Sequence, residues 1–290
     1  MGRRCSLARR LPSGAHPVGR RAMLSAEGQA EFEERGFTRL EGVFSREAAE
    51  AMQARLWETL GQRLGARRDD PSTWTVEHAS GLQALKLDPV FEPIGGAALT
   101  GALDTLLGAG RWRPPKNWGQ FLVSFPLAGA AWTVPHHVWH TDFGFHLPPD
   151  RTCGALVLSF LADVPPRGGG TVLLAGSPEL VRRHLAGDPL APRRKMAFVR
   201  RALLGSDPWL AALSSPGEDQ ERIARFMEGD HEVDGIPLRV VELSGRAGDV
   251  VLGHPWALHA TAPNCGERPR RMRVQRVHVP LARTGPASDA

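Results

Sequence analysis

The chain has 290 residues, of which 42% are hydrophobic and 23% charged, so it is long enough to bury one sizeable core. No apolar run is long enough to cross a bilayer, so the sequence predicts no transmembrane helix and no membrane partner. The three cysteines lie far apart without a CxxC pair. This excludes a disulfide framework and a thiolate zinc site, and it predicts a cytoplasmic protein.

The net charge of +5 comes from the first 22 residues, which contain six arginines and no acidic residue. Subtracting these six charges from +5 leaves −1 for residues 23–290. Because phosphate contacts need clustered Lys and Arg, this near-neutral body predicts no nucleic-acid partner. We expect residues 1–22 to be a disordered extension. A transit peptide is one interpretation, and a start codon assigned too early, with Met23 the true first residue, is the favoured one.

The first predicted elements are helices. Ser25 is an N-cap residue for a helix that stops at Gly36, and a short strand and turn follow. Ser45 begins a second helix, in which apolar residues recur at helical spacing. A third helical piece is expected near 95–108.

Short strands separated by Gly and Pro turn signals follow the helices. Helices first and strands afterwards predict an α+β layout whose core is a β-sandwich or barrel. The strands are expected at 119–126, 137–145, 154–164, 170–176, 238–244, 249–254 and 270–279.

The stretch WHTDFGF, residues 139–145, places a histidine and an aspartate two positions apart. In a strand, His140 and Asp142 would face the same side. A buried carboxylate is costly unless it is paired or bound to a metal. The two side chains would supply two of the three ligands of a 2-His-1-carboxylate iron(II) site. A His–Asp hydrogen bond is the ordinary alternative, so a second histidine must decide.

The best downstream candidates are His254 and His259, in the stretch GDVVLGHPWALHATAPN. They are five positions apart, so a regular strand would turn them to opposite faces. Pro255 could disturb this alternation, and periodicity alone leaves both histidines open.

Four stretches of the chain resemble the phytanoyl-CoA dioxygenase family of iron(II)- and 2-oxoglutarate-dependent oxygenases. FEERGFTRLEGVFSREAAEAM is similar to the opening helix, strand and helix of that family, and WHTDF to its ligand strand. GGGTVLLAGSPEL resembles its Gly-rich turn and following strand, although Ala175 and Pro178 replace the usual proline and histidine. HATAPNCGERPRR is similar to a segment with a histidine and, eleven residues later, an arginine.

The resemblance implies a single oxygenase domain over residues 23–285, followed by a tail at 286–290. It implies a double-stranded β-helix (jelly-roll) core with the N-terminal helices packed on one side. It also implies Fe(II), 2-oxoglutarate and O2, with succinate and CO2 as co-products and a small molecule as substrate. The alternative is a jelly-roll protein that binds a metal or ligand without oxidising anything.

For the site, the resemblance implies that His259 joins His140 and Asp142 as the third iron ligand. It makes Thr261 and Arg270 the holders of the far carboxylate of 2-oxoglutarate, with Gln120 a weaker candidate for the same cosubstrate. Because related halogenases have a small residue at the aspartate position, the carboxylate implies hydroxylation or a related oxidation.

Strand parity supports the choice of Arg270. It shares a face with Met272 and Val274, an apolar inward face, whereas Arg271 and Arg273 are expected on the outward face. A guanidinium inside the fold needs a fixed anion, and its planar fork suits a carboxylate. An internal salt bridge is the alternative.

Residues 178–237 form a long connection between two predicted strands, and short stretches of helical periodicity predict helices within it. We expect this insertion to cover the iron site, with Trp209, Leu210 and Phe226 as apolar lining. Its basic residues have two interpretations: a solvated face, which is favoured, and a holder for an anionic substrate group. These residues are Arg193, Arg194, Lys195, Arg200 and Arg201.

Overall fold

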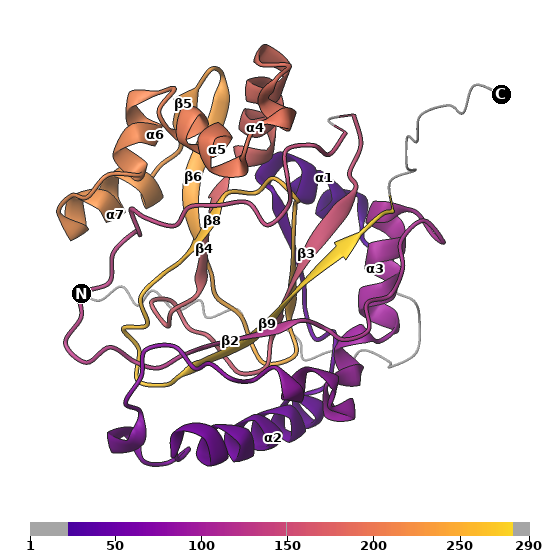
Figure 1. Cartoon of the computed structure of the whole chain (residues 1–290), viewed down its shortest axis with the longest axis vertical. Coiled ribbons are helices and arrows are strands. Elements are labelled where there is room, and N and C mark those ends of the chain that lie inside the picture. The colour runs from indigo at the N-terminus through magenta and orange to yellow at the C-terminus, as the bar shows by residue number, and fades with distance from the viewer. Residues whose placement is uncertain (1–22, 149, 281–290) are drawn as a thin grey trace, which may run out of the picture.

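The computed structural model describes residues 23–148 and 150–280; the predicted extension 1–22 and tail 286–290 lie outside the described residues. Two antiparallel sheets form the core, one of five strands in the order β1-β7-β3-β9-β2 and one of four in the order β5-β6-β4-β8 (Figure 1). This confirms the predicted α+β jelly roll. The strands are β1 Phe37–Leu40, β2 Gln120–Ser124, β3 Gly154–Phe160, β4 Thr171–Ala175, β5 His231–Val233, β6 Ile236–Leu243, β7 Val250–Gly253, β8 His259–Thr261 and β9 Arg270–His278.

The N-terminal helices begin and end where the capping residues predict. The Ser25 hydroxyl accepts a hydrogen bond from the Gly28 amide at 3.1 Å, and α1 ends at Gly36 in the left-handed conformation (φ 87°). The Ser45 hydroxyl caps the second helix in the same way. These helices are α1 Ala26–Arg35, α2 Arg46–Leu64 and α3 Ala97–Leu107, with 3-10 turns η1 Pro71–Thr73, η2 Ala84–Leu87 and η3 Pro89–Gly95.

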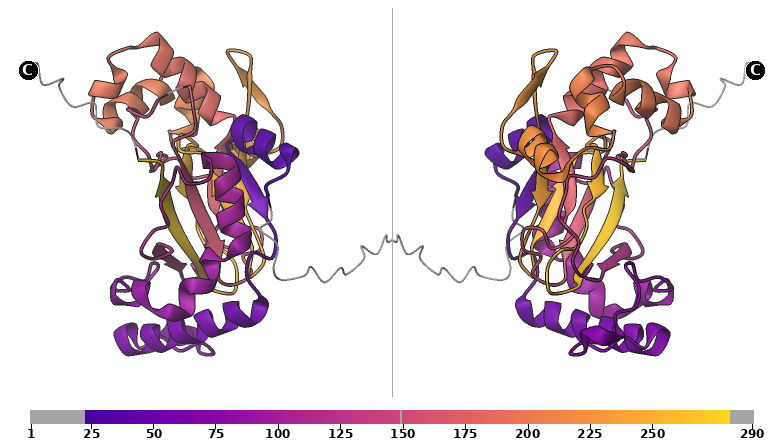
Figure 2. Two further views of the ribbon diagram at one scale, coloured as in Figure 1. Left: turned by 90° about the vertical axis from the view of Figure 1, so that its right-hand side faces the viewer. Right: turned by 90° about the vertical axis from the view of Figure 1, so that its left-hand side faces the viewer.

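The five-stranded sheet is buried on both faces. Ala155 and Val157 of β3 pack with α1, α2 and α3 in one hydrophobic cluster, whereas Leu156 and Leu158 pack between the two sheets in another. In Figure 2 the helical layer runs along one side of this sheet. Burial on both faces explains why β3 is apolar apart from Ser159 and does not alternate with polar residues.

The far face of β9 is also buried, which corrects the expectation that Arg271 and Arg273 face outward. The side chain of Arg273 is 0% exposed. Its guanidinium donates to the carbonyls of Lys86 (3.2 Å) and Gly119 (2.6 Å). It also lies over the rings of Phe91 and Phe121, 4.5 and 4.6 Å from their centroids. Strand parity therefore assigns Arg270 and Arg273 to opposite faces of β9 correctly, but helices cover the face that holds Arg273.

The insertion at 178–237 packs on the outer face of the four-stranded sheet. Trp209, Leu210 and Phe226 join Val172 and Leu174 of β4 in a second core. Trp209, Leu210 and Phe226 do not line the cavity described below, so the expectation that they line the iron site is wrong. The helices are α4 Ser177–Gly187, α5 Met196–Leu204, α6 Pro208–Leu213 and α7 Asp219–Met227, with the turn η4 Ala191–Arg193.

The strand expected at 137–145 does not form. Residue Val138 has a positive φ of 55°, which an extended strand cannot contain. Only His140 pairs with another strand, through an isolated bridge to His259 of β8. The HxD stretch is therefore a loop whose backbone pairs with a strand only at His140. Within the described ranges, no helix is both long and apolar enough to span a membrane.

Candidate metal and cosubstrate site

Three side chains converge between the sheets. One ligand atom each from His140, Asp142 and His259 lies within 4.8 Å of the others. The two histidines are joined by reciprocal backbone hydrogen bonds, His140 N to His259 O at 3.0 Å and His259 N to His140 O at 2.9 Å. This bridge brings the loop and β8 together, so the side chains meet although the predicted strand is absent.

Both imidazoles have the orientation that a metal requires. The Nδ1 atom of His140 lies 2.7 Å from the Val138 carbonyl, and that of His259 lies 3.0 Å from the Ala257 carbonyl. A carbonyl oxygen can only accept, so each Nδ1 must carry the proton. Each Nε2 is then left with a free lone pair, as in metal-binding histidines generally.

The protonation states suit a cation. Burial, followed by the charge of His259, lowers the pKa of His140, which favours the neutral imidazole. Burial alone would raise the pKa of Asp142, but the nearby His259, Arg276 and His140 outweigh it, and the pKa falls. The Nε2 atom of His259 lies 3.6 Å from the Oδ2 atom of Asp142. Neutral imidazole and ionised carboxylate are the forms that bind metal.

These three side chains line a cavity of about 580 Å³. Gln120 of β2 and Thr261 of β8 also line it, and both are exposed. The structure thus brings Gln120, Thr261 and the three converging residues to one cavity. Other residues that line this cavity are Lys86, Asn117, Leu122, Leu158, Thr171, Val274, Gln275, Arg276 and His278.

Arg270 lies directly behind this wall. It is 2% exposed, and its Nη2 donates to the Thr171 hydroxyl at 3.1 Å, while its Nε lies 3.3 Å from the Met272 sulfur. Burial lowers its pKa to about 10, against the opposing charge of Glu242. In the described part of the chain no carboxylate forms an ion pair with it. The internal salt bridge considered from the sequence is therefore absent there.

Thr171 is a candidate that sequence reasoning missed. It pairs with Thr261 across β4 and β8, so two hydroxyl side chains lie next to each other on the cavity wall. Its parity with Leu173, which faces the space between the sheets, was the available signal.

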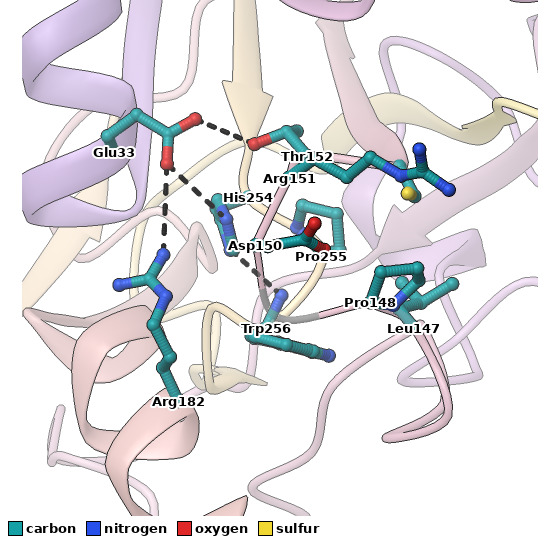
Figure 3. Close-up of a pocket in the computed structure, with 11 residues that line it drawn as sticks. Glu33, Leu147, Pro148, Asp150, Arg151, Thr152, Arg182, His254, Pro255 and Trp256 are labelled. Atoms are coloured by element: carbon teal, nitrogen blue, oxygen red, sulfur yellow. Dashed lines mark hydrogen bonds and ion pairs between the residues drawn. The ribbon is translucent and has the colours of Figure 1, made fainter. Parts of the chain in front are cut away.

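His254 lies in a different pocket of about 320 Å³, between α1, α4 and the loop after β7 (Figure 3). Its Nδ1 accepts from the Trp256 amide at 3.1 Å, and its Nε2 lies 3.9 Å from Glu33 Oε2. Burial lowers its pKa to about 3. Glu33 in turn contacts Arg182 and the Thr152 hydroxyl, so this is a polar network that braces α1. The geometry brings His259, and not His254, to His140 and Asp142.

The sequence matches the family model for phytanoyl-CoA dioxygenase (PhyH) over residues 32–272. The chain belongs to this family. The matched range includes the converging triad, Thr261 and Arg270. A search of the curated proteins gave no match.

AviO1 and EvdMO1 share the fold of this PhyH family member. AviO1 from Streptomyces viridochromogenes Tue57 is 20% identical, with a TM-score of 0.52, over 91% of this chain and 100% of AviO1. EvdMO1 is 17% identical, with a TM-score of 0.52, over 88% of this chain and 50% of EvdMO1. HygX from Streptomyces hygroscopicus, with nickel and 2-oxoglutarate bound, is 18% identical, with a TM-score of 0.46, over 89% of this chain and 88% of HygX.

Proposed function

We propose that this PhyH family member is an iron(II)- and 2-oxoglutarate-dependent dioxygenase that hydroxylates an unactivated C–H bond of a small molecule. The observation that carries the proposal is the convergence of two oriented imidazoles and one carboxylate in a cavity that is backed by a buried arginine. The cavity volume of about 580 Å³ suits a small molecule.

The donor set fits iron(II). Two neutral imidazoles and one carboxylate are the ligands of the facial triad, which leaves coordination positions open for cosubstrate and oxygen. His140, Asp142 and His259 would hold the ion. When bound, it supplies the oxidising chemistry, in which 2-oxoglutarate and O2 are consumed and succinate and CO2 are released. The protein contributes the fixed ligand geometry and the enclosing walls.

The far carboxylate of 2-oxoglutarate is assigned to Arg270, with the hydroxyls of Thr171 and Thr261 beside it. A guanidinium binds a carboxylate through two parallel hydrogen bonds, and it stays charged in the folded protein. Arg270 bears the desolvation cost of burial without an ion pair among the described residues, and an incoming anion would offset that cost. Gln120 of β2 lines the same cavity and would contact the cosubstrate from that side.

Asp142 supports hydroxylation over halogenation. A halide needs the coordination position that this carboxylate would fill, and the carboxylate is within reach of both imidazoles. Product analysis by mass spectrometry, with a gain of one oxygen atom in the substrate, tests this part of the proposal. A chlorinated product in the presence of chloride would contradict it.

The metal assignment is tested by calorimetric titration with Co(II) under anaerobic conditions, in place of the oxidisable Fe(II). Each of His140→Ala, Asp142→Ala and His259→Ala should abolish or strongly weaken binding. His254→Ala is the matched control, since it removes a buried histidine outside the triad, and it should leave Co(II) affinity unchanged in the folded protein. Loss of binding in His254→Ala alone would overturn the assignment.

Catalysis is tested separately by succinate formation from 2-oxoglutarate with Fe(II) and O2, with and without candidate substrates. Turnover that disappears in the triad variants supports a dioxygenase. Intact metal binding with no 2-oxoglutarate consumption under any condition would instead identify a non-catalytic metal-binding jelly roll.

A further inference from the structure

A second groove lies on the other side of the loop that carries His140. It has a volume of about 390 Å³ and lies between residues 136–139 and the helices α5 and α6 of the insertion. The loop residues of the groove directly precede His140, and the cavity of the candidate metal site begins at His140 itself. The two spaces therefore share one short piece of backbone.

The groove has an apolar side. Trp139 and Leu204 are buried in its wall, and Val138 is 60% exposed at its edge. A β-branched residue with φ of 55° is a backbone outlier that costs free energy, and such outliers gather at functional sites. Here the unusual backbone does two things at once. The Val138 carbonyl accepts from His140 Nδ1 at 2.7 Å, and the Val138 side chain is turned out into the groove.

The opposite side of the groove is cationic. Arg200 and Arg201 of α5 line it together with His136, and no acidic side chain does. In the chain as described, neither arginine side chain makes an ion pair or a hydrogen bond with another residue. Arg194, by contrast, pairs with Asp188 at 2.7 Å. Among the basic residues of this part of the insertion, Arg194 is thus paired, whereas Arg200 and Arg201 line the groove.

The groove adjoins the candidate metal site, because Val138 and Trp139 line the groove and the next residue, His140, lines the cavity. An anion bound there would gain charge-assisted hydrogen bonds from a planar donor fork.

We propose that this groove binds the anionic end of the substrate, a carboxylate or phosphate, on Arg200 and Arg201, while an apolar skeleton runs along Val138 toward the candidate metal site. The substrate class is thus an amphipathic organic anion. This inference rests on the proposed function, because it makes the groove the substrate subsite of that reaction.

The test uses octanoate, octyl phosphate and octanol as probes of equal chain length, titrated calorimetrically into the full-length protein loaded with Co(II) and 2-oxoglutarate. The two anions should bind and octanol should bind at least about tenfold more weakly, because octanol cannot form charge-assisted hydrogen bonds with the arginines. The double variant Arg200→Gln, Arg201→Gln should lose this preference but keep Co(II) and 2-oxoglutarate affinity. Arg193→Gln, an exposed arginine outside the groove, is the matched control and should bind like the wild type.

A second readout places the probe relative to the metal. Bound Co(II) should broaden the proton resonances of octanoate, most strongly at the methyl end. Equal binding of octanol and octanoate, an unchanged preference in the double variant, or no paramagnetic broadening would each overturn the proposal. If the anions bind through both arginines to a protein that takes up neither Co(II) nor 2-oxoglutarate, the proposed function fails, and the groove stands as an anion site without a role as substrate subsite.

Discussion

The two faces of strand β9 bury arginines in opposite ways. Arg270 faces the space between the sheets and Arg273 faces the helices, and burial lowers the pKa of each to about 10. Arg273 has two carbonyl acceptors and two aromatic rings, whereas Arg270 has one hydroxyl and a thioether sulfur. Arg273 also keeps unused donors, because its Nε and Nη1 are buried without a hydrogen-bond partner in the described residues. The faces differ in surroundings: two aromatic rings enclose the Arg273 guanidinium, whereas the Thr171 partner of Arg270 lines the cavity. Missing hydrogen bonds alone therefore do not indicate a ligand site; a position beside the cavity does.

Removing the poorly supported guanidinium should have the largest effect. Arg270→Ala should weaken 2-oxoglutarate binding by about 2–5 kcal/mol, because truncation leaves the carboxylate of the cosubstrate buried and unpaired. Calorimetric titration of the Co(II)-loaded protein measures this. Arg270→Lys keeps the charge without the planar fork and should fall in between. Unchanged affinity in Arg270→Ala would place the cosubstrate elsewhere.

The Arg273 guanidinium, which two aromatic rings enclose, should affect stability and not binding. Arg273→Met keeps most of the volume but leaves the Lys86 and Gly119 carbonyls without this donor, which costs about 1–3 kcal/mol of unfolding free energy. Denaturant unfolding measures the loss, and 2-oxoglutarate affinity of the folded protein should stay at the wild-type value. If both arginine variants lost the cosubstrate equally, the contrast between the two faces would be void.

A third buried arginine extends the comparison to the insertion. Arg222 of α7 is 5% exposed and donates to the Val134 and Pro135 carbonyls at 2.9 and 3.1 Å, just before the loop that carries His140. It also donates to three carbonyls around α6, so it fastens this loop to the insertion. Arg222→Lys should lower Co(II) affinity about tenfold, as loss of outer support does at metal sites. Arg225→Lys on the same helix is the control, and equal Co(II) binding in both variants would contradict the fastening role.

The smallest effect concerns the histidine that lies outside the triad. Burial holds the pKa of His254 at about 3, below the usual value of about 6.5. Its contribution to stability is therefore complete above about pH 6.5 and declines as the pH falls toward 3, because the unfolded chain takes up the proton first. His254→Asn should show a smaller drop in Tm between pH 7.5 and pH 5 than the wild type. A parallel drop would show that His254 does not cause the acid sensitivity.

Local chemistry predicted much of the fold. Ser25 and Ser45 fix helix starts through a single hydroxyl, so their effect is readable from a few neighbouring residues. The face of Arg270 followed from strand parity. The burial of Arg273 on the other face could not be predicted from strand parity, because the helices that bury it are distant in sequence. The strand predicted for His140 and Asp142 was wrong, since residues 137–145 form no strand and His140 is placed by one bridge.

The packing partners of the insertion could not be predicted from the sequence either. Helical periodicity identified Trp209 and Phe226 as apolar residues with something to pack against, but periodicity does not say against what. They pack on the outer face of β4, and the groove of the insertion is lined instead by Arg200 and Arg201. Pairing across sheets, as between Thr171 and Thr261, is also a long-range property that no single segment contains.

The backbone pairing of His140 with His259 has a further consequence for how the site can be observed. Each amide proton of the pair is held by the other residue's carbonyl, so both exchange with solvent only when the loop separates from β8. A metal bound to both imidazoles would be a second link between the loop and β8, and it should slow the exchange of both amides together. Deuterium uptake at these two positions therefore reports metal occupancy without any turnover.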